Sequence, residues 1–162
     1  MKGNKRTLAT LTAALSLLLC SCTSTSTISA PHTVTLIAKS TQTEFWLSVF
    51  AGAEAAATEY NLDLNIVGPD TEEDYETQNQ MVDEAVQAGT EALVFSAIHY
   101  DNNADAIDAA AQKGVKIVAI DSNVDSQAVS TYIGTDNYAA GQMAAQAALN
   151  RVEGELHVGI IN

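Results

Sequence analysis

Short apolar runs alternate with longer segments of helical periodicity along most of this chain. The clearest run covers residues 114–120 and stops abruptly at Asp121. A short apolar run bounded by turn residues is typical of a strand that is buried on both faces of a parallel sheet. Runs of the same kind predict further strands over 34–39, 62–67, 92–96, 130–134 and 155–161.

The segments between these runs predict helices. Within 44–60, apolar residues recur at positions 46, 50, 53, 57 and 60, which lie on one face of a helix, and Asn61 can end it in a left-handed turn. The other predicted helices cover 70–88, 102–113 and 136–151. Strands and helices that alternate with short loops predict an α/β fold, a doubly wound parallel sheet with right-handed crossovers.

The first 22 residues are predicted to be a secretory signal outside this fold. A basic start precedes an apolar run over 8–19, which is too short for a permanent membrane helix. The run leads into Leu-Cys-Ser-Cys, which resembles the lipobox of bacterial lipoproteins. The small Ser21 favours Cys22 over Cys20 as the lipidated residue, and an ordinary signal peptide with incidental cysteines is the alternative. Residues 23–32 are predicted to be a Ser/Thr-rich tether.

The charge of the chain excludes two classes of partner. The net charge is −13, and removal of residues 1–22 leaves four basic against twenty acidic residues, a net charge of −16. Such a surface repels nucleic acid and anionic lipid, so we expect no nucleic-acid partner and no membrane contact beyond a lipid anchor. Hydrophobic residues make up 47% of the chain, which is enough for a globular domain.

Polar and aromatic residues follow the predicted strands at the points where they end. These residues include Thr43, Phe45, Trp46, Ser96, Asp121, Ser122 and Thr135. In open α/β sheets, ligands bind outside the carboxyl ends of the strands. Hydroxyls, a carboxylate and flat rings suit an uncharged hydroxylated ligand such as a sugar, because a carboxylate accepts strong hydrogen bonds from adjacent hydroxyls. Trp46 also falls on the apolar helix face, so one ring of the aromatic pair is open to a core role.

Signatures of catalysis, cofactors and metals are missing from the sequence. It has no phosphate-binding glycine loop, no GxSxG elbow and no HExxH pair. The acidic stretch 70–76 lacks the glycine turn of a calcium loop and suits a helix amino terminus. His32, His99 and His157 form no spaced ligand set. His99 is interpreted as a solvent-exposed loop residue, with a contact to a ligand as the alternative. We therefore expect no enzyme, no cofactor and no metal.

Four segments together resemble the ribose-binding-protein class. They are 34–46, Gly52-Ala53, 114–121 and 132–141. This class consists of periplasmic or lipid-anchored solute-binding proteins of ABC sugar importers, which share a fold with the ligand domains of LacI-type repressors. The lipobox and the absence of DNA-binding helices favour the transport branch. The resemblance implies a monomeric, extracytoplasmic protein that binds a monosaccharide or similar polyol and docks on ABC permease subunits.

The resemblance also implies roles for individual residues. It assigns ligand contacts to Thr43, Phe45, Trp46, Ser96, Asp121, Ser122 and Thr135. The aromatic pair stacks on the sugar, and the aspartate binds its hydroxyls. Ser122 stands where ribose binders often carry arginine, which argues against ribose itself, and Thr135 matches the first hinge crossing between two lobes.

The length of the chain limits this resemblance. Residues 33–136 are expected to form the amino-terminal ligand-binding lobe, and 137–162 to begin a second lobe. These last 26 residues are fewer than the roughly 40 that usually fold alone. We expect a truncated member, either a fragmentary gene product or an incomplete sequence, whose open half-site binds ligand weakly or not at all. The alternatives are a sugar or autoinducer sensor that presents its ligand to a membrane receptor, or a fragment without function.

Overall fold

The computed structural model describes residues 30–155 and 157–159. The predicted signal peptide, Cys22 and most of the tether lie outside the described residues. Strands and helices alternate as the sequence predicts. The elements are β1 (His32–Ile37), α2 (Glu44–Tyr60), β2 (Leu62–Val67), α3 (Tyr75–Gln87), β3 (Ala92–Phe95), α4 (Ala104–Gln112), β4 (Lys116–Ile120), β5 (Val129–Ile133) and α5 (Asn137–Leu149).

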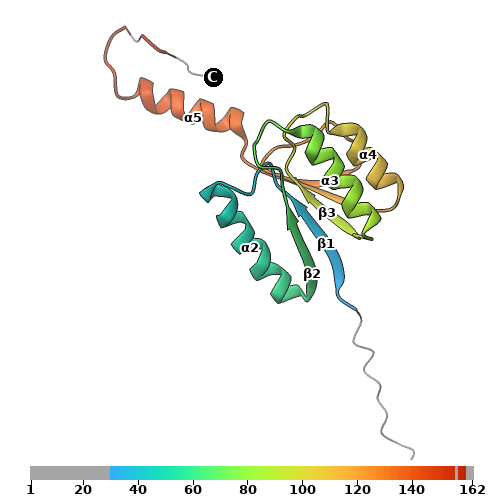
Figure 1. The fold of residues 1–162 in the computed structure, drawn as a ribbon. Coiled ribbons are helices and arrows are strands. Elements are labelled where there is room, and N and C mark those ends of the chain that lie inside the picture. The colour runs from blue at the N-terminus through green and yellow to red at the C-terminus, as the bar shows by residue number, and fades with distance from the viewer. Residues whose placement is uncertain (1–29, 156, 160–162) are drawn as a thin grey trace, which may run out of the picture. The chain divides into compact units, whose positions relative to one another are not determined.

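The strands form one parallel sheet in the order β2-β1-β3-β4-β5 (Figure 1). The two faces of the sheet are covered by different helices. Leu36 packs with Trp46 and Phe50 of α2, whereas the next residue, Ile37, packs with side chains of α3 and α4. Because successive side chains of a strand point to opposite faces, α2 lies on one face and α3 and α4 on the other. The predicted doubly wound sheet is confirmed.

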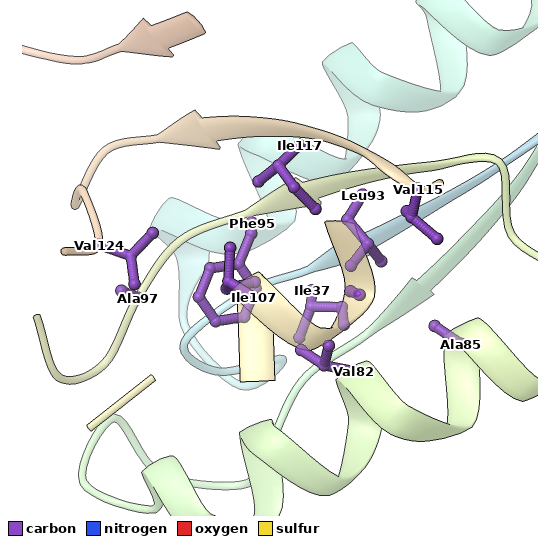
Figure 2. Packing of buried hydrophobic residues seen from close by; sticks show 11 residues of the cluster. Ile37, Val82, Ala85, Leu93, Phe95, Ala97, Ile107, Val115, Ile117 and Val124 are labelled. Carbon is purple, nitrogen blue, oxygen red and sulfur yellow. The ribbon is translucent and has the colours of Figure 1, made fainter. Parts of the chain in front are cut away.

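The larger core cluster lies between the sheet and the pair α3 and α4. Figure 2 shows Val82 of α3 and Ile107 of α4 beside Ile37 and Phe95 of the sheet, and all four side chains are fully buried. Burial of a large apolar side chain stabilises the fold by about 1.5–3 kcal/mol. This cluster therefore secures the strands whose carboxyl ends carry the candidate site.

Helix α2 begins and ends where the sequence predicts. The Thr43 hydroxyl accepts a hydrogen bond from the Trp46 amide at 3.4 Å, and Asn61 ends the helix in the left-handed region with φ 52°. Trp46, Phe50 and Ala57 are buried as expected. The inward position predicted for Tyr60 is wrong, because this last residue of the helix is 67% exposed.

Helix α3 begins later than predicted. Asp74 is its N-cap, and its carboxylate accepts hydrogen bonds from the Thr77 amide at 2.9 Å and the Thr77 hydroxyl at 2.7 Å. These two bonds lower the pKa of Asp74 below its ordinary value of 3.8. The predicted start at residue 70 is wrong, because the capping side chain comes four residues later and leaves 70–73 in the preceding loop.

The carboxyl-terminal part of the chain differs most from the prediction. Helix α5 starts at Asn137 as expected, with the Asp136 side chain as its cap, but it buries none of its own side chains. Of the strand predicted over 155–161, residues 155 and 157–159 are not in a strand, and the others lie outside the described residues. A strand needs a neighbour for its hydrogen bonds, and the described residues offer none here.

Candidate functional site

Asp121 directly follows β4 and has an unusual backbone conformation. Its φ is 56°, in the left-handed region that few residues other than glycine adopt. Its amide donates to the Ile133 carbonyl at 2.9 Å, and its carbonyl accepts from the Tyr132 hydroxyl at 2.7 Å. A strained backbone persists only where its surroundings hold it. Here two hydrogen bonds to β5, one at the amide and one at the carbonyl, hold Asp121. The carboxylate therefore starts from a fixed backbone.

Three side chains meet the Asp121 carboxylate at the carboxyl edge of the sheet. Its Oδ2 accepts from the Ser96 hydroxyl at 3.3 Å and the Ser122 hydroxyl at 3.2 Å, and the Lys39 ammonium lies 3.0 Å from it. Lys39, Ser96 and Asp121 follow β1, β3 and β4, so three neighbouring strands converge on one oxygen. The Asp121 side chain is still 39% exposed and open to a ligand.

The sequence analysis placed Ser96, Asp121 and Ser122 together, but it missed Lys39. A lysine that ends an apolar strand, two residues after β1, is the signal that was available. Ser96 itself is fully buried, so its hydroxyl faces the carboxylate and not the solvent. In this structure Ser96 and Lys39 position the Asp121 carboxylate, which stays accessible to a ligand.

Gln78 of α3 is a second residue that the sequence analysis missed. It is fully buried, and its amide nitrogen donates to the Ala38 and Ser96 carbonyls, both at 2.9 Å. Its amide oxygen accepts from the Ile98 amide at 3.1 Å. One side chain thereby ties the ends of β1 and β3 together, directly beside Lys39 and Ser96. In the sequence, Gln78 stands among other polar residues of a predicted helix, and nothing there distinguishes it from a residue exposed to solvent.

The aromatic pair at the start of α2 is divided between core and surface. Trp46 is 1% exposed, belongs to the α2 core cluster, and donates its indole N–H to the Glu72 carboxylate at 2.9 Å. Phe45 is 56% exposed and meets Trp46 edge to face, with ring centroids 5.0 Å apart and planes at 81°. Only the Phe45 ring is therefore open to a partner in this structure.

The other predicted residues lie at the same edge without a direct contact to Asp121. Thr43 is exposed and caps α2. Thr135 is exposed in the loop after β5, two residues beyond Ile133. His99 is exposed as expected, and its loop is held by the Asn103 side chain, which accepts from the His99 amide at 2.8 Å. Of the predicted site residues, Ser96 and Ser122 therefore contact Asp121 directly, whereas Thr43 and Thr135 do not.

Tyr100 in the same loop shows how acidic this edge is. Its hydroxyl lies 3.4 Å from the Asp125 carboxylate, and the negative charge of Asp125 raises the pKa of Tyr100 above its ordinary value.

Among the described residues, no three acidic, histidine or cysteine side chains are grouped to hold a metal ion, and no helix has the length and hydrophobicity of a membrane span.

Comparison with known proteins decides the family. The sequence profile of the periplasmic binding protein domain matches residues 34–162. This chain belongs to the periplasmic binding protein family. The ribose import binding protein RbsB of Bacillus subtilis (strain 168) is 28% identical over 113 residues, which cover 70% of this chain and 36% of that protein.

Solved structures of this family share the fold described above. A carbohydrate transporter solute-binding protein from Agrobacterium radiobacter, in complex with D-arabinose, is 31% identical with a TM-score of 0.70, over 75% of this chain and 42% of that one. XylFII in complex with LytSN is 29% identical with a TM-score of 0.65, over 75% and 44%. The chain thus spans less than half the length of these relatives. The proteins from Bacillus subtilis and Agrobacterium radiobacter are named as binding proteins, and membership of the family implies an extracytoplasmic location.

Proposed function

We propose that this chain carries one half of a monosaccharide site in the solute-binding protein of an ABC-type sugar importer. The observation that carries the proposal is the Asp121 carboxylate, which is held by Lys39, Ser96 and Ser122 on a fixed backbone at the carboxyl edge of the sheet. A preoriented carboxylate accepts hydrogen bonds from sugar hydroxyls without a cost of reordering. No step of this function is catalytic.

The other edge residues have distinct roles in the proposal. The exposed Phe45 ring packs against the apolar C–H face of the sugar, and Trp46 supports it from the core. Ser122 and the exposed Thr43 and Thr135 offer hydroxyls at the rim of the same edge. The absence of a positive side chain at position 122 favours a sugar other than ribose.

The proposal also divides the chain. Residues 33–136 form the ligand-binding lobe, and 137–162 belong to a second lobe. The exposure of α5 supports this boundary, because Tyr138 is 77% and Met143 73% exposed. Apolar side chains of a helix normally pack against a neighbour, and in the proposal the second lobe covers them.

Substitution of Asp121 tests the binding role directly. Asp121→Asn keeps the size of the side chain and, like aspartate, tolerates positive φ. Loss of hydrogen bonds to a charged acceptor costs about 1.5–3 kcal/mol, or about 10- to 100-fold in affinity. D-arabinose, D-ribose, D-galactose and D-glucose are titrated by saturation-transfer NMR, which detects millimolar binding. The matched control is Asp63→Asn, an exposed carboxylate in β2. Equal affinity of the Asp121→Asn variant and the unsubstituted chain would contradict the proposed role.

Lipid anchoring through Cys22 completes the proposal. The Ser/Thr-rich segment 23–32 then tethers the lobe to the membrane, so that the protein is peripheral and held by its acyl chains. Mass spectrometry of the membrane fraction should find the acyl groups on Cys22. Cys22→Ala should release the protein, and Cys20→Ala should not. Acylation that follows Cys20 would overturn the choice between the two.

A sensor is the second candidate function. The similarity to XylFII in its complex with LytSN favours it, since that relative assembles with another protein. In this alternative the same edge binds a sugar or autoinducer, and the closed protein is presented to a membrane receptor. Crosslinking in the native membrane, with and without added sugar, distinguishes the two functions. Capture of permease subunits supports import, and sugar-dependent capture of a receptor supports sensing.

A further inference from the structure

Tyr132 of β5 donates its phenol hydroxyl to the Asp121 carbonyl, and the same ring lies directly against Gly134. We infer that Tyr132 is a positioning residue, which holds the Asp121 backbone in the conformation that directs its carboxylate to the ligand. Position 134 then has to be glycine, because the Tyr132 ring occupies the space of a side chain there. This inference rests on the proposed function and adds two residues to its site.

Asp121 is the central residue of a tight three-residue turn at the end of β4. The Ser122 amide donates to the Ile120 carbonyl at 2.6 Å, and φ of Asp121 is 56°. A three-residue turn with a positive φ at its centre is rare and strained. The turn therefore needs hydrogen bonds from outside itself in order to persist.

Two hydrogen bonds with β5 hold this turn, and one of them depends on a particular side chain. The bond from the Asp121 amide to the Ile133 carbonyl joins two backbone groups and places no demand on either side chain. The bond from the Tyr132 hydroxyl to the Asp121 carbonyl, at 2.7 Å, requires a tyrosine. No other side chain of the described residues donates to the Asp121 backbone. Tyr132 is thus the part of this support that the sequence specifies.

The Tyr132 ring takes this position because Gly134 has no side chain. A Cβ at position 134 would lie 2.1 Å from the Tyr132 hydroxyl oxygen and 2.4 Å from ring carbon Cζ, which is closer than nonbonded atoms approach. Gly134 does not have a positive φ, so its backbone conformation is open to other residues. The ring, and not the backbone, therefore requires glycine at this position.

The turn decides where the Asp121 carboxylate lies, because the direction of the Cα–Cβ bond follows the backbone. With a negative φ at Asp121, the carboxylate is directed away from the Ser96 hydroxyl, which now lies 3.3 Å from Oδ2, and from the Ser122 hydroxyl at 3.2 Å. The carboxylate is then no longer preoriented, and its reordering weakens the binding of a ligand. The loss of one such hydrogen bond corresponds to about two- to tenfold in affinity.

Four variants of the full chain separate the hydroxyl, the ring and the glycine. Tyr132→Phe removes only the hydroxyl, and Gly134→Ala displaces the ring. Tyr132→Ala and the double variant Tyr132→Ala/Gly134→Ala complete a double-mutant cycle. The matched control is Tyr60→Phe, the same chemical change in the 67% exposed ring that ends α2.

Two quantities are measured for each protein. Saturation-transfer NMR gives the affinity for D-arabinose, D-ribose, D-galactose and D-glucose. The backbone 13C chemical shifts of Asp121, measured without ligand, distinguish a left-handed from an extended residue and respond to the hydrogen bond at its carbonyl.

The expected results depend on the phenol contact and not on overall stability. Tyr132→Phe and Gly134→Ala should each weaken sugar binding about two- to tenfold and move the Asp121 carbonyl shift in the same direction. In the Tyr132→Ala background, Gly134→Ala should change neither quantity further, since no ring is left to displace. Tyr60→Phe should match the unsubstituted chain. A tyrosine with only a structural role would lower the thermal midpoint of Tyr132→Phe and leave the Asp121 shifts unchanged.

The outcomes separate this inference from the proposed function. Unchanged Asp121 shifts or unchanged sugar affinity in Tyr132→Phe overturn the inference and leave the proposed function standing. An equal effect of Gly134→Ala with and without the Tyr132 ring also overturns it, because the backbone would then be what requires glycine. If no sugar binds to the unsubstituted chain, the proposed function is overturned, and the Asp121 shifts of the same variants still decide whether Tyr132 and Gly134 hold the turn.

Discussion

Replacement of Gln78 by leucine should destabilise this protein through three backbone groups at once. Leucine fills a similar volume, so the change removes the amide and leaves the core packing nearly intact. The carbonyls of Ala38 and Ser96 and the amide of Ile98 then lose their partner. Each polar group buried without a partner costs about 1–3 kcal/mol, and the added apolar burial offsets about 1–2 kcal/mol. We expect a net loss of about 3 kcal/mol, a large part of a typical folding free energy of about 5–15 kcal/mol.

Urea unfolding followed by circular dichroism measures this loss. With a slope of about 1.5 kcal/mol per molar urea, the unfolding midpoint should fall by about 2 M at an unchanged slope. The control is Gln80→Leu, an exposed position in the same helix with the same chemical change, which should stay within about 0.5 kcal/mol. A Gln78→Leu midpoint equal to that of the control would refute the reasoning. If the chain binds a sugar as proposed, Gln78→Leu should weaken that binding as well, because Gln78 hydrogen-bonds the ends of the strands beside Lys39 and Ser96.

Three further predictions concern the capping residues and the single tryptophan. Asn61→Ala should lower stability by about 1 kcal/mol in thermal unfolding, whereas Asn61→Gly should be nearly neutral, because φ is 52° there and alanine disfavours the left-handed region. The lowered pKa of Asp74 means that its contribution to stability is present above the ordinary pKa of 3.8 and is lost as the pH falls through the lower folded value. The stability advantage of the unsubstituted chain over Asp74→Asn should therefore shrink between pH 5 and about pH 2, and a constant difference in thermal midpoint would contradict this linkage. Iodide should scarcely quench the fluorescence of Trp46, which is 1% exposed, and efficient quenching would place the ring at the surface.

Most of the fold could be predicted from local patterns. The apolar runs predicted the five strands of the sheet. Helical periodicity, together with Asn61 as the cap, predicted both ends of α2 correctly. The predictions were wrong where burial or strand pairing depends on residues that are distant in the sequence. Tyr60 has an apolar position in the pattern but is 67% exposed, and the predicted strand at 155–161 has no partner strand among the described residues.

The candidate site was predicted only in part, for a related reason. Because parallel strands end at one edge, the sequence sufficed to group Ser96, Asp121 and Ser122. It could not show that Trp46 is buried while Phe45 is exposed, since adjacent residues of a helix point in different directions and their environment depends on packing. It also could not pair Lys39 with Asp121, because 82 residues separate them along the chain.

The amino-acid sequence alone determined the parallel α/β sheet, the family resemblance and the position of Asp121 at the end of β4. These follow from hydrophobic periodicity and from residues that stand next to one another in the chain. Only the tertiary structure decided which atoms meet the carboxylate of Asp121, through the strand order β2-β1-β3-β4-β5 and the buried amide of Gln78. The strand order places β3 between β1 and β4, and this arrangement brings Lys39 across β3 to a residue that no local pattern could connect to it.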